Sequence, residues 1–246
     1  MGAGPPRRPH RRTAGAAGPG AQRRCGGRPP GRTRIGQPLT APDTLIRCPW
    51  AGPDELYLRY HDTEWGRELH GDDAMFERLC LEAFQSGLSW ITILRKRPAF
   101  RAAFAGFAIE RVAEFGDDDV ARLLADSGIV RNRSKIEAAI ANARVARDLD
   151  IGLDDLLWSF APEPRPRPRT VADVPATTPE SVALAKELKR RGFRFVGPTT
   201  AYALMQATGM VDDHLADCWV ESDPPDTATA ITFRTQVSVH SGDREE

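Results

Sequence analysis

Residues 188–204 read LKRRGFRFVGPTTAYAL, and this stretch decides the fold class. We predict that one helix ends at Gly192, because glycine readily adopts the left-handed conformation found just past helix ends. A hairpin then leads to Gly197 and Pro198, which open the next helix. Gly197 leaves the neighbouring amides unobstructed, so this helix N-terminus can hold a phosphate on backbone N–H groups. A plain helical hairpin with solvated charges is the alternative interpretation.

The helical pattern extends to both sides of this hairpin. Apolar residues recur at three- and four-residue spacing, and the only strand candidate, FRFV at 193–196, is too short to found a sheet. The stretch 161–170, APEPRPRPRT, cannot be helical because of its prolines. These features predict an all-α fold, with Asp72, Asn132 and Thr178 as N-caps. The predicted helices cover 54–62, 72–86, 89–104, 109–115, 117–126, 132–149, 153–160, 179–191 and 198–210.

Charge and composition divide the chain into three parts. Residues 1–44 hold nine Arg and one Asp among many Gly and Pro, so we expect a disordered arm that could add sequence-independent attraction to phosphates. Residues 45–220 form the expected domain, and 221–246 a disordered tail. Beyond the arm, 25 Lys and Arg face 33 Asp and Glu, so nucleic acid would need a local basic patch. Basic residues gather at two helix junctions: Arg131, Arg133 and Lys135, and Arg190, Arg191 and Arg194.

The sequence predicts no membrane span and no signal peptide. It contains no apolar run of about 18 residues, and the arm lacks the apolar region of a signal peptide. The four cysteines form no tight framework. Cys80 lies in an apolar helix and is interpreted as an inert core thiol. We therefore expect a cytoplasmic protein, and a monomer.

The stretch LCLEAFQSGLSW, residues 79–90, places one carboxylate in an apolar helix. Glu82 follows Leu81, and Trp90 comes after a turn at Gly87. Burying an unpaired carboxylate is costly or raises its pKa. Either Glu82 points sideways to an Arg or to water, or its partner is a ligand in a functional site.

Four metal-binding side chains lie near the two ends of the predicted domain. Cys48 and His61 are thirteen residues apart, and His214 and Cys218 are four apart in VDDHLADCW. On a helix, the second spacing would place both side chains on one face. Two Cys and two His form a tetrahedral set suited to zinc, although this spacing is not a finger motif. A closed four-ligand site would be structural and would join the ends of the domain.

Four motifs resemble the DNA-3-methyladenine glycosylase I family, the constitutive alkyl-base excision enzymes of bacteria. They are RCPWAGPDELYLRYHDTEWG (47–66), LCLEAFQSGLSWITILRKR (79–97), SGIVRNRSKI (127–136) and RGFRFVGPTTAYALMQATGMVDDHLADC (191–218). The motifs occur in the family's order and together span roughly 70% of the chain. The arm and the segment beyond Trp219 have no counterpart in the resemblance.

The resemblance implies the helix-hairpin-helix glycosylase fold, with alkylated double-stranded DNA as substrate and 3-methyladenine as product. It implies one structural zinc per chain, held by Cys48, His61, His214 and Cys218. It places Glu82 in the base pocket as the catalytic residue. The candidate pocket aromatics are Trp50, Tyr57, Tyr60, Trp65 and Trp90. Trp50 and Trp65 could equally be core residues. The candidate DNA contacts are Arg133, Arg191, Arg194 and Gly197.

The chemistry of this lesion would give Glu82 a partner. A stacked base must be flipped into a pocket before it can be cut. 3-Methyladenine is cationic in DNA, so aromatic faces attract it and a carboxylate can accept hydrogen bonds from its edge. The departing base is neutral, so little acid catalysis is needed. Two alternatives stay open: a non-catalytic helix-hairpin-helix DNA-binding module with a structural zinc, and a helical zinc protein that binds a metabolite.

One position departs from the family pattern. The run V-N-D-H, common in the family, is here Val211-Asp212-Asp213-His214. Related helix-hairpin-helix glycosylases place an Asp shortly after the hairpin, where it stabilises the sugar cation or orients water. Asp212 is therefore either a catalytic carboxylate or a cap beside the metal ligands.

Overall fold

The computed structural model describes residues 44–222, and helices account for its regular structure. The predicted arm up to residue 43 and the predicted tail from residue 223 lie outside the described residues. No strand occurs in residues 44–222, so the predicted all-α class is confirmed there. The elements are η1 (Pro49–Ala51), α1 (Glu55–Thr63), α2 (Asp72–Gln85), α3 (Trp90–Ala103), η2 (Ala105–Phe107), α4 (Ile109–Ala113), α5 (Asp117–Ala125), α6 (Arg133–Arg147), α7 (Leu153–Trp158), η3 (Val171–Asp173), α8 (Pro179–Arg191) and α9 (Pro198–Ala207).

Local signals account for most helix ends. The side chain of Asn132 accepts a hydrogen bond from the amide of Lys135 at 3.1 Å, as an N-cap does. Thr178 caps α8 with Pro179 as the first helical residue. Asp72 was expected to cap α2 but is its first residue, because Gly71 occupies the cap position. None of the helices described is long and apolar enough to span a membrane.

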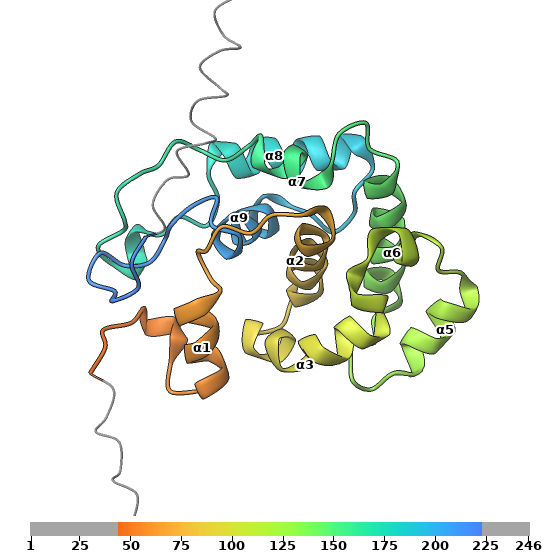
Figure 1. The fold of residues 1–246 in the computed structure, drawn as a ribbon, viewed down its shortest axis with the longest axis horizontal. Coiled ribbons are helices and arrows are strands. Elements are labelled where there is room, and N and C mark those ends of the chain that lie inside the picture. The colour runs from red at the N-terminus through yellow and green to blue at the C-terminus, as the bar shows by residue number, and fades with distance from the viewer. Residues whose placement is uncertain (1–43, 223–246) are drawn as a thin grey trace, which may run out of the picture. The chain divides into compact units, whose positions relative to one another are not determined.

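Helix α2 lies at the centre of the bundle and packs against α3, α6 and α9 (Figure 1). Every residue from Met75 to Phe84 is buried, so α2 is enclosed on all sides. This position explains why its sequence is apolar around the whole helix. It also explains why the few charged side chains within that range are buried, among them Arg78 and Glu82.

The helix-hairpin-helix joins α8 to α9 as predicted. Gly192 ends α8 in the left-handed region at φ 102°, and Gly197 precedes α9. Asn142 of α6 holds the hairpin through both ends of its amide. Its Oδ1 accepts from the backbone N–H of Arg194 at 2.7 Å, and its Nδ2 donates to the Arg194 carbonyl at 3.0 Å. This buried clamp fixes the hairpin against α6.

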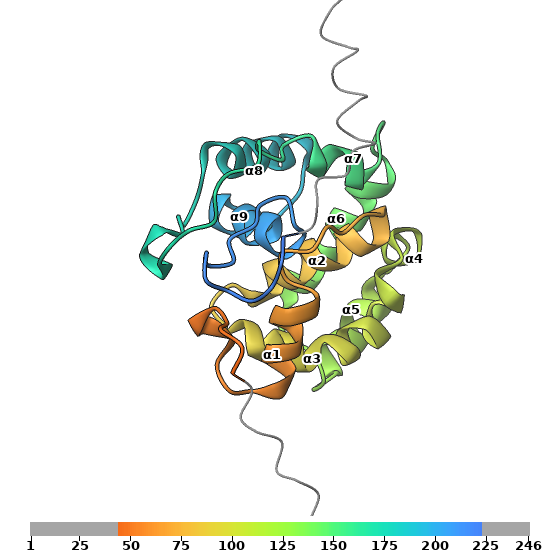
Figure 2. The same cartoon turned by 60° about the vertical axis from the view of Figure 1, so that its left-hand side comes forward.

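The segment after α9 returns to the N-terminal side of the domain (Figure 2). The amide of Trp219 donates to the carbonyl of Ile46 at 2.8 Å, and that of Ala216 donates to Pro168 at 2.9 Å. The expectation that His214 and Cys218 share a helix face is wrong, because this segment is not helical. The segment is an irregular loop tied to the start of the described chain and to the Pro/Arg stretch.

Candidate functional site

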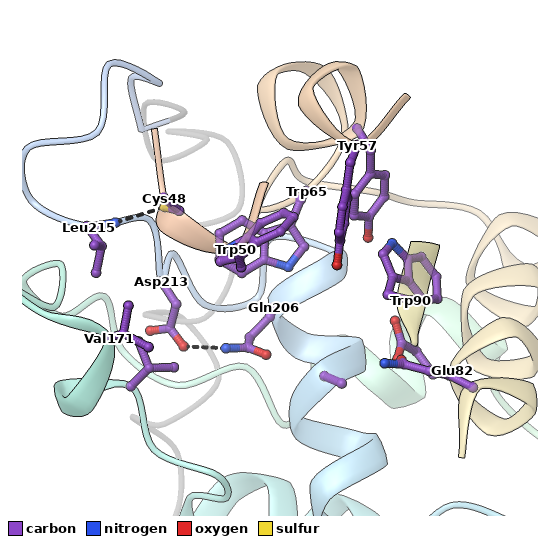
Figure 3. Close-up of a pocket in the computed structure, with 14 residues that line it drawn as sticks. Cys48, Trp50, Tyr57, Trp65, Glu82, Trp90, Val171, Gln206, Asp213 and Leu215 are labelled. Carbon is purple, nitrogen blue, oxygen red and sulfur yellow. Dashed lines mark hydrogen bonds between the residues drawn. The ribbon is translucent and has the colours of Figure 1, made fainter. Parts of the chain in front are cut away.

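A cavity of about 230 Å³ lies between α1, α2 and α9 (Figure 3). Its walls also include the start of α3, the short helices η1 and η3, and the segment after α9. All six side chains predicted for the base pocket line it: Trp50, Tyr57, Tyr60, Trp65, Glu82 and Trp90. The structure therefore gathers the predicted carboxylate and the predicted aromatics around one space.

Glu82 faces this cavity without a protein partner. Its side chain is 6% exposed, and it makes no hydrogen bond or ion pair within residues 44–222. Burial raises the pKa of its carboxyl group to about 8, against the opposing charge of Arg78. The alternative of a direct ion pair with an Arg does not hold, since the guanidinium of Arg78 donates to Glu64 instead.

Tyr60 and Trp90 line the cavity together with Glu82, and Figure 3 shows Trp90 beside Glu82. Their ring centroids are 5.4 Å apart and the rings are tilted by 46°. The indole Nε1 of Trp90 is buried and has no hydrogen-bond partner among the described residues. A buried donor without a partner is costly, so this N–H and the Glu82 carboxylate are both poised for a polar ligand.

Trp50 and Trp65 connect the cavity to the predicted metal ligands. Their ring centroids are 4.8 Å apart, edge to face. Trp65 also meets the ring of His214 at 4.7 Å, and Trp50 meets His61 at 5.2 Å. The two interpretations of these tryptophans therefore combine, because each lines the cavity and packs against the ligand cluster.

Three of the four predicted metal ligands lie together at one buried point, and the fourth, His214, packs beside them. The ligand atoms of Cys48, His61 and Cys218 all lie within 4.8 Å of one another. The ring of His214 approaches that of His61 to 5.0 Å between centroids, and its Nε2 is buried without a partner in the described chain. Gly66 makes room for this ring, since a Cβ there would lie 2.7 Å from the His214 Cε1 atom.

Two carboxylates orient the two imidazoles. Nδ1 of His61 lies 2.8 Å from Asp62, and Nδ1 of His214 lies 2.9 Å from Asp212. Each carboxylate is itself paired with an arginine: Arg47 binds Asp62, and Arg167 binds Asp212. An N–H at Nδ1 leaves Nε2 as the acceptor, which is the usual arrangement around a metal-bound histidine. In His61 this nitrogen accepts from the backbone N–H of Cys48 at 3.3 Å, and in His214 it has no partner among the described residues. The donor set and its outer partners thus fit a tetrahedral metal ion.

The sequence model of the methyladenine glycosylase family matches residues 50–221. The chain belongs to this family. Among curated relatives, DNA-3-methyladenine glycosylase 1 of Escherichia coli is 45% identical over 179 residues, which is 71% of this chain and 96% of that protein. DNA-3-methyladenine glycosylase of Haemophilus influenzae is 43% identical over 178 residues, covering 70% and 96%.

Solved structures of methyladenine glycosylases have the same fold. A crystal structure of 3-methyladenine DNA glycosylase I is 45% identical, with a TM-score of 0.68, and covers 71% of this chain and 98% of that one. The Staphylococcus aureus enzyme, whose structure addresses recognition of 3-methyladenine, is 34% identical. Its TM-score is 0.70, and the match covers 73% of this chain and 98% of that one.

In this glycosylase, Asp212 lies outside the cavity. Its Oδ1 accepts hydrogen bonds from the amide and the ring of His214, and its Oδ2 accepts from Arg167 and Ser222. Asp212 does not line the pocket, whereas Asp213 does. This geometry favours the interpretation of Asp212 as a cap beside the metal ligands.

Three polar residues of the glycosylase pocket were not predicted. Gln85 lies three residues after Glu82 on α2, a spacing that places both on one face and could have revealed it. Asp213 accepts hydrogen bonds from Tyr202 at 2.5 Å and from Gln206 at 2.8 Å, and it pairs with Arg165. The partners of Asp213 lie 7 to 48 positions away, so no local pattern marks Asp213 or Gln206.

The predicted basic patch of the glycosylase is smaller than expected. Arg191 is engaged by Glu187 and Asp150, and Arg133 pairs with Glu137. Lys135 is buried, with its Nζ donating to the carbonyls of Phe84 and Ser86, so it caps the end of α2 and does not face solvent. Arg194 is exposed, and its side chain has no partner within residues 44–222.

Proposed function

We propose that this protein excises 3-methyladenine from alkylated duplex DNA, by flipping the damaged nucleotide and hydrolysing its glycosidic bond. The observation that carries the proposal is Glu82, a buried carboxylate in an aromatic cavity that has no hydrogen bond or ion pair within the described part of the chain. The match covers nearly the whole length of the relatives that are named as 3-methyladenine glycosylases, which supports the same reaction here.

The cavity suits a cationic base better than a neutral one. Each aromatic face attracts a cation by roughly 0.5–2 kcal/mol, and more when water is excluded. The Glu82 carboxylate adds a charge-assisted hydrogen bond, and the unpartnered N–H of Trp90 can donate to a ring nitrogen. Because 3-methyladenine leaves the sugar as a neutral base, discrimination from normal adenine can rest on binding the charged form.

Base release tests the function directly. Methylated duplex DNA incubated with the protein should release free 3-methyladenine, and unmethylated duplex should release none. The full chain and a version that starts at Thr44 should both be active, since the pocket is formed by residues 48–215. Binding of duplex DNA without any base release would instead support the non-catalytic module.

We further propose that Cys48, His61, His214 and Cys218 hold one structural zinc ion. Burial, aided by the neighbouring Cys218 thiol, raises the pKa of Cys48 to about 12, so its thiolate needs a cation close by. The backbone N–H of Leu215 points at the Cys48 sulfur at 3.4 Å, which stabilises a thiolate. A bound zinc would join the start of the domain to the segment after α9 and so support the pocket wall at Trp50 and Trp65.

The hairpin is the proposed duplex-binding element. Gly197 has φ −94° and ψ 173°, and a Cβ there would meet no atom within 4 Å. Gly197→Val should therefore fold normally while its side chain blocks phosphates from the α9 amides. We expect weaker duplex binding on every sequence, with binding of free 3-methyladenine unchanged. Arg194→Ala should lower the slope of log affinity against log salt by up to about one unit.

Gly116→Val is the matched control for the hairpin variant. Gly116 also precedes a helix, α5, and a Cβ there also meets open space. Its substitution should leave duplex affinity unchanged when the three variants are titrated onto labelled DNA at several salt concentrations. Wild-type affinity in both Gly197→Val and Arg194→Ala would show that the duplex binds elsewhere.

The pH dependence of excision follows from the pKa of Glu82. Below a pKa of about 8 the carboxyl group is protonated and cannot attract a cationic base. We expect the single-turnover rate at limiting enzyme to rise between pH 6 and about 8 and then level off. The Glu82→Gln variant should lose this rise, because it has no group that titrates in the same range. A pH-independent wild-type rate would contradict the prediction.

A further inference from the structure

We propose that Arg78 is a positioning residue for base excision, whose buried guanidinium favours the charged form of Glu82 from behind the pocket wall. The inference rests on the proposed function, since it concerns the charge state of the residue that would read the base. Arg78 lies four residues before Glu82 on α2, so the two side chains leave the same side of the helix one turn apart.

Burying the Arg78 guanidinium costs free energy unless a nearby group of opposite charge compensates it. Its side chain is 9% exposed, and its Nη1 is buried with no hydrogen-bond partner among the described residues. Its Nη2 donates to Glu64 at 2.9 Å. Its Cζ lies 5.7 Å from the ring centroid of Tyr60, an aromatic residue that lines the cavity. A buried guanidinium with unused donors is unfavourable on its own.

Glu64 does not account for this cation. Arg97 already binds both carboxylate oxygens of Glu64, at 2.5 and 2.8 Å. One carboxylate and two guanidinium groups leave one positive charge in excess under the pocket wall. Glu77, the residue before Arg78 on α2, is paired with Arg101, so this carboxylate has its own cation and leaves the excess in place. Glu82 is a buried carboxylate with no ion pair or hydrogen bond within residues 44–222, and Arg78 is the cation whose charge acts on it.

Other charged or titratable groups lie around Glu82, but they do not replace Arg78. Asp213, across the cavity, is paired with Arg165, and Lys135 of α6 is directed to backbone carbonyls. The phenols of α1 hold their protons, because burial raises the pKa of each. Arg78 is the cation that lowers the pKa of the Glu82 carboxyl group against the effect of burial. The groups concerned are Tyr57, Tyr60, Arg78, Lys135 and Asp213.

Arg78→Met tests the proposal because methionine fills the space without a charge and leaves the Glu64–Arg97 pair intact. The rise of single-turnover 3-methyladenine release with pH should move upward by about one unit, which is about a tenfold loss below the wild-type midpoint. The rate reached at high pH should stay near wild type. Arg78→Lys should return the pH profile most of the way to that of the wild type. Arg101→Met, which removes the arginine that pairs with Glu77 on α2, should leave the profile unchanged.

A loss of rate that is equal at every pH, or a profile matching that of Arg101→Met, would show that Arg78 is only structural. A second measurement needs no substrate. The gain in melting temperature from Glu82→Gln at pH 8–9 should be larger in the Arg78→Met background than with Arg78 present, because the uncompensated carboxylate is costlier there. Equal gains would overturn the proposal. If wild-type protein releases no base at any pH, the proposed function fails, and this comparison still decides the role of Arg78.

Discussion

At pH 9, where the wild-type carboxylate is charged, Glu82→Gln should lower the single-turnover rate of 3-methyladenine release about 10- to 150-fold while the protein stays folded. A charge-assisted hydrogen bond in a dry site is worth roughly 1.5–3 kcal/mol, which gives that range of rates. Glutamine keeps the size and most of the packing of the side chain. Glu82 has no ion pair or hydrogen bond in the described chain, so no buried cation loses a direct partner. Zinc content should match that of the wild type.

The stability of the same variant gives an independent check with a defined sign. Glu82 binds its proton more tightly in the folded state, with a pKa of about 8, than in the unfolded chain, where 4.5 is usual. Wild-type stability relative to Glu82→Gln should therefore fall as pH rises from about 4.5 to about 8. The melting temperature of the variant should exceed that of the wild type at pH 9 and match it near pH 4. A destabilised variant with normal excision would refute the pocket role of Glu82.

Removing a proposed zinc ligand should have the largest effect on stability. His214→Ala and Cys48→Ser should each lose the bound zinc, of which wild-type protein should hold about one per chain, and should melt at much lower temperature. Structural zinc contributes roughly 10–16 kcal/mol to folding in zinc-finger peptides, so even a fraction of this would be decisive in one domain. The two halves of the proposed zinc site are over 150 positions apart in the chain, so losing the link between them should cost much stability.

Cys80→Ser is the control for the metal experiment. Cys80 is a buried thiol in α2, and among residues 44–222 it lies outside the cluster of Cys48, His61 and Cys218. Its substitution should reduce stability modestly and leave the zinc content unchanged, as measured by elemental analysis beside thermal unfolding. Metal-free wild-type protein, with His214→Ala and Cys48→Ser as stable as the wild type, would rule out the zinc site.

Local sequence signals predicted the elements because each signal acts within one turn of the chain. Gly192 and Pro198 mark the hairpin through their own backbone preferences, and Asn132 caps α6 through an amide three residues away. The expectation of a helix through His214 and Cys218 was wrong, and this also has a local cause. The side chain of Asp212 takes the amide of His214, which competes with helix formation. Three of the four predicted metal ligands, Cys48, His61 and Cys218, lie close together, and a loop rather than a helix carries Cys218 there.

The amino-acid pattern was enough to predict the helices and the hairpin, because periodicity and capping are properties of short stretches. The pocket residues were predicted from the resemblance of the motifs to the family. The tertiary structure was needed to show that Asp213 enters the cavity while Asp212 leaves it, and that Lys135 is buried. It was also needed to show that Arg78 is buried against Tyr60 and that its charge acts on Glu82. These features depend on burial and on charges brought together from distant parts of the chain. The energy of a buried charge is set by its surroundings in space, which the spacing of residues along the chain does not record.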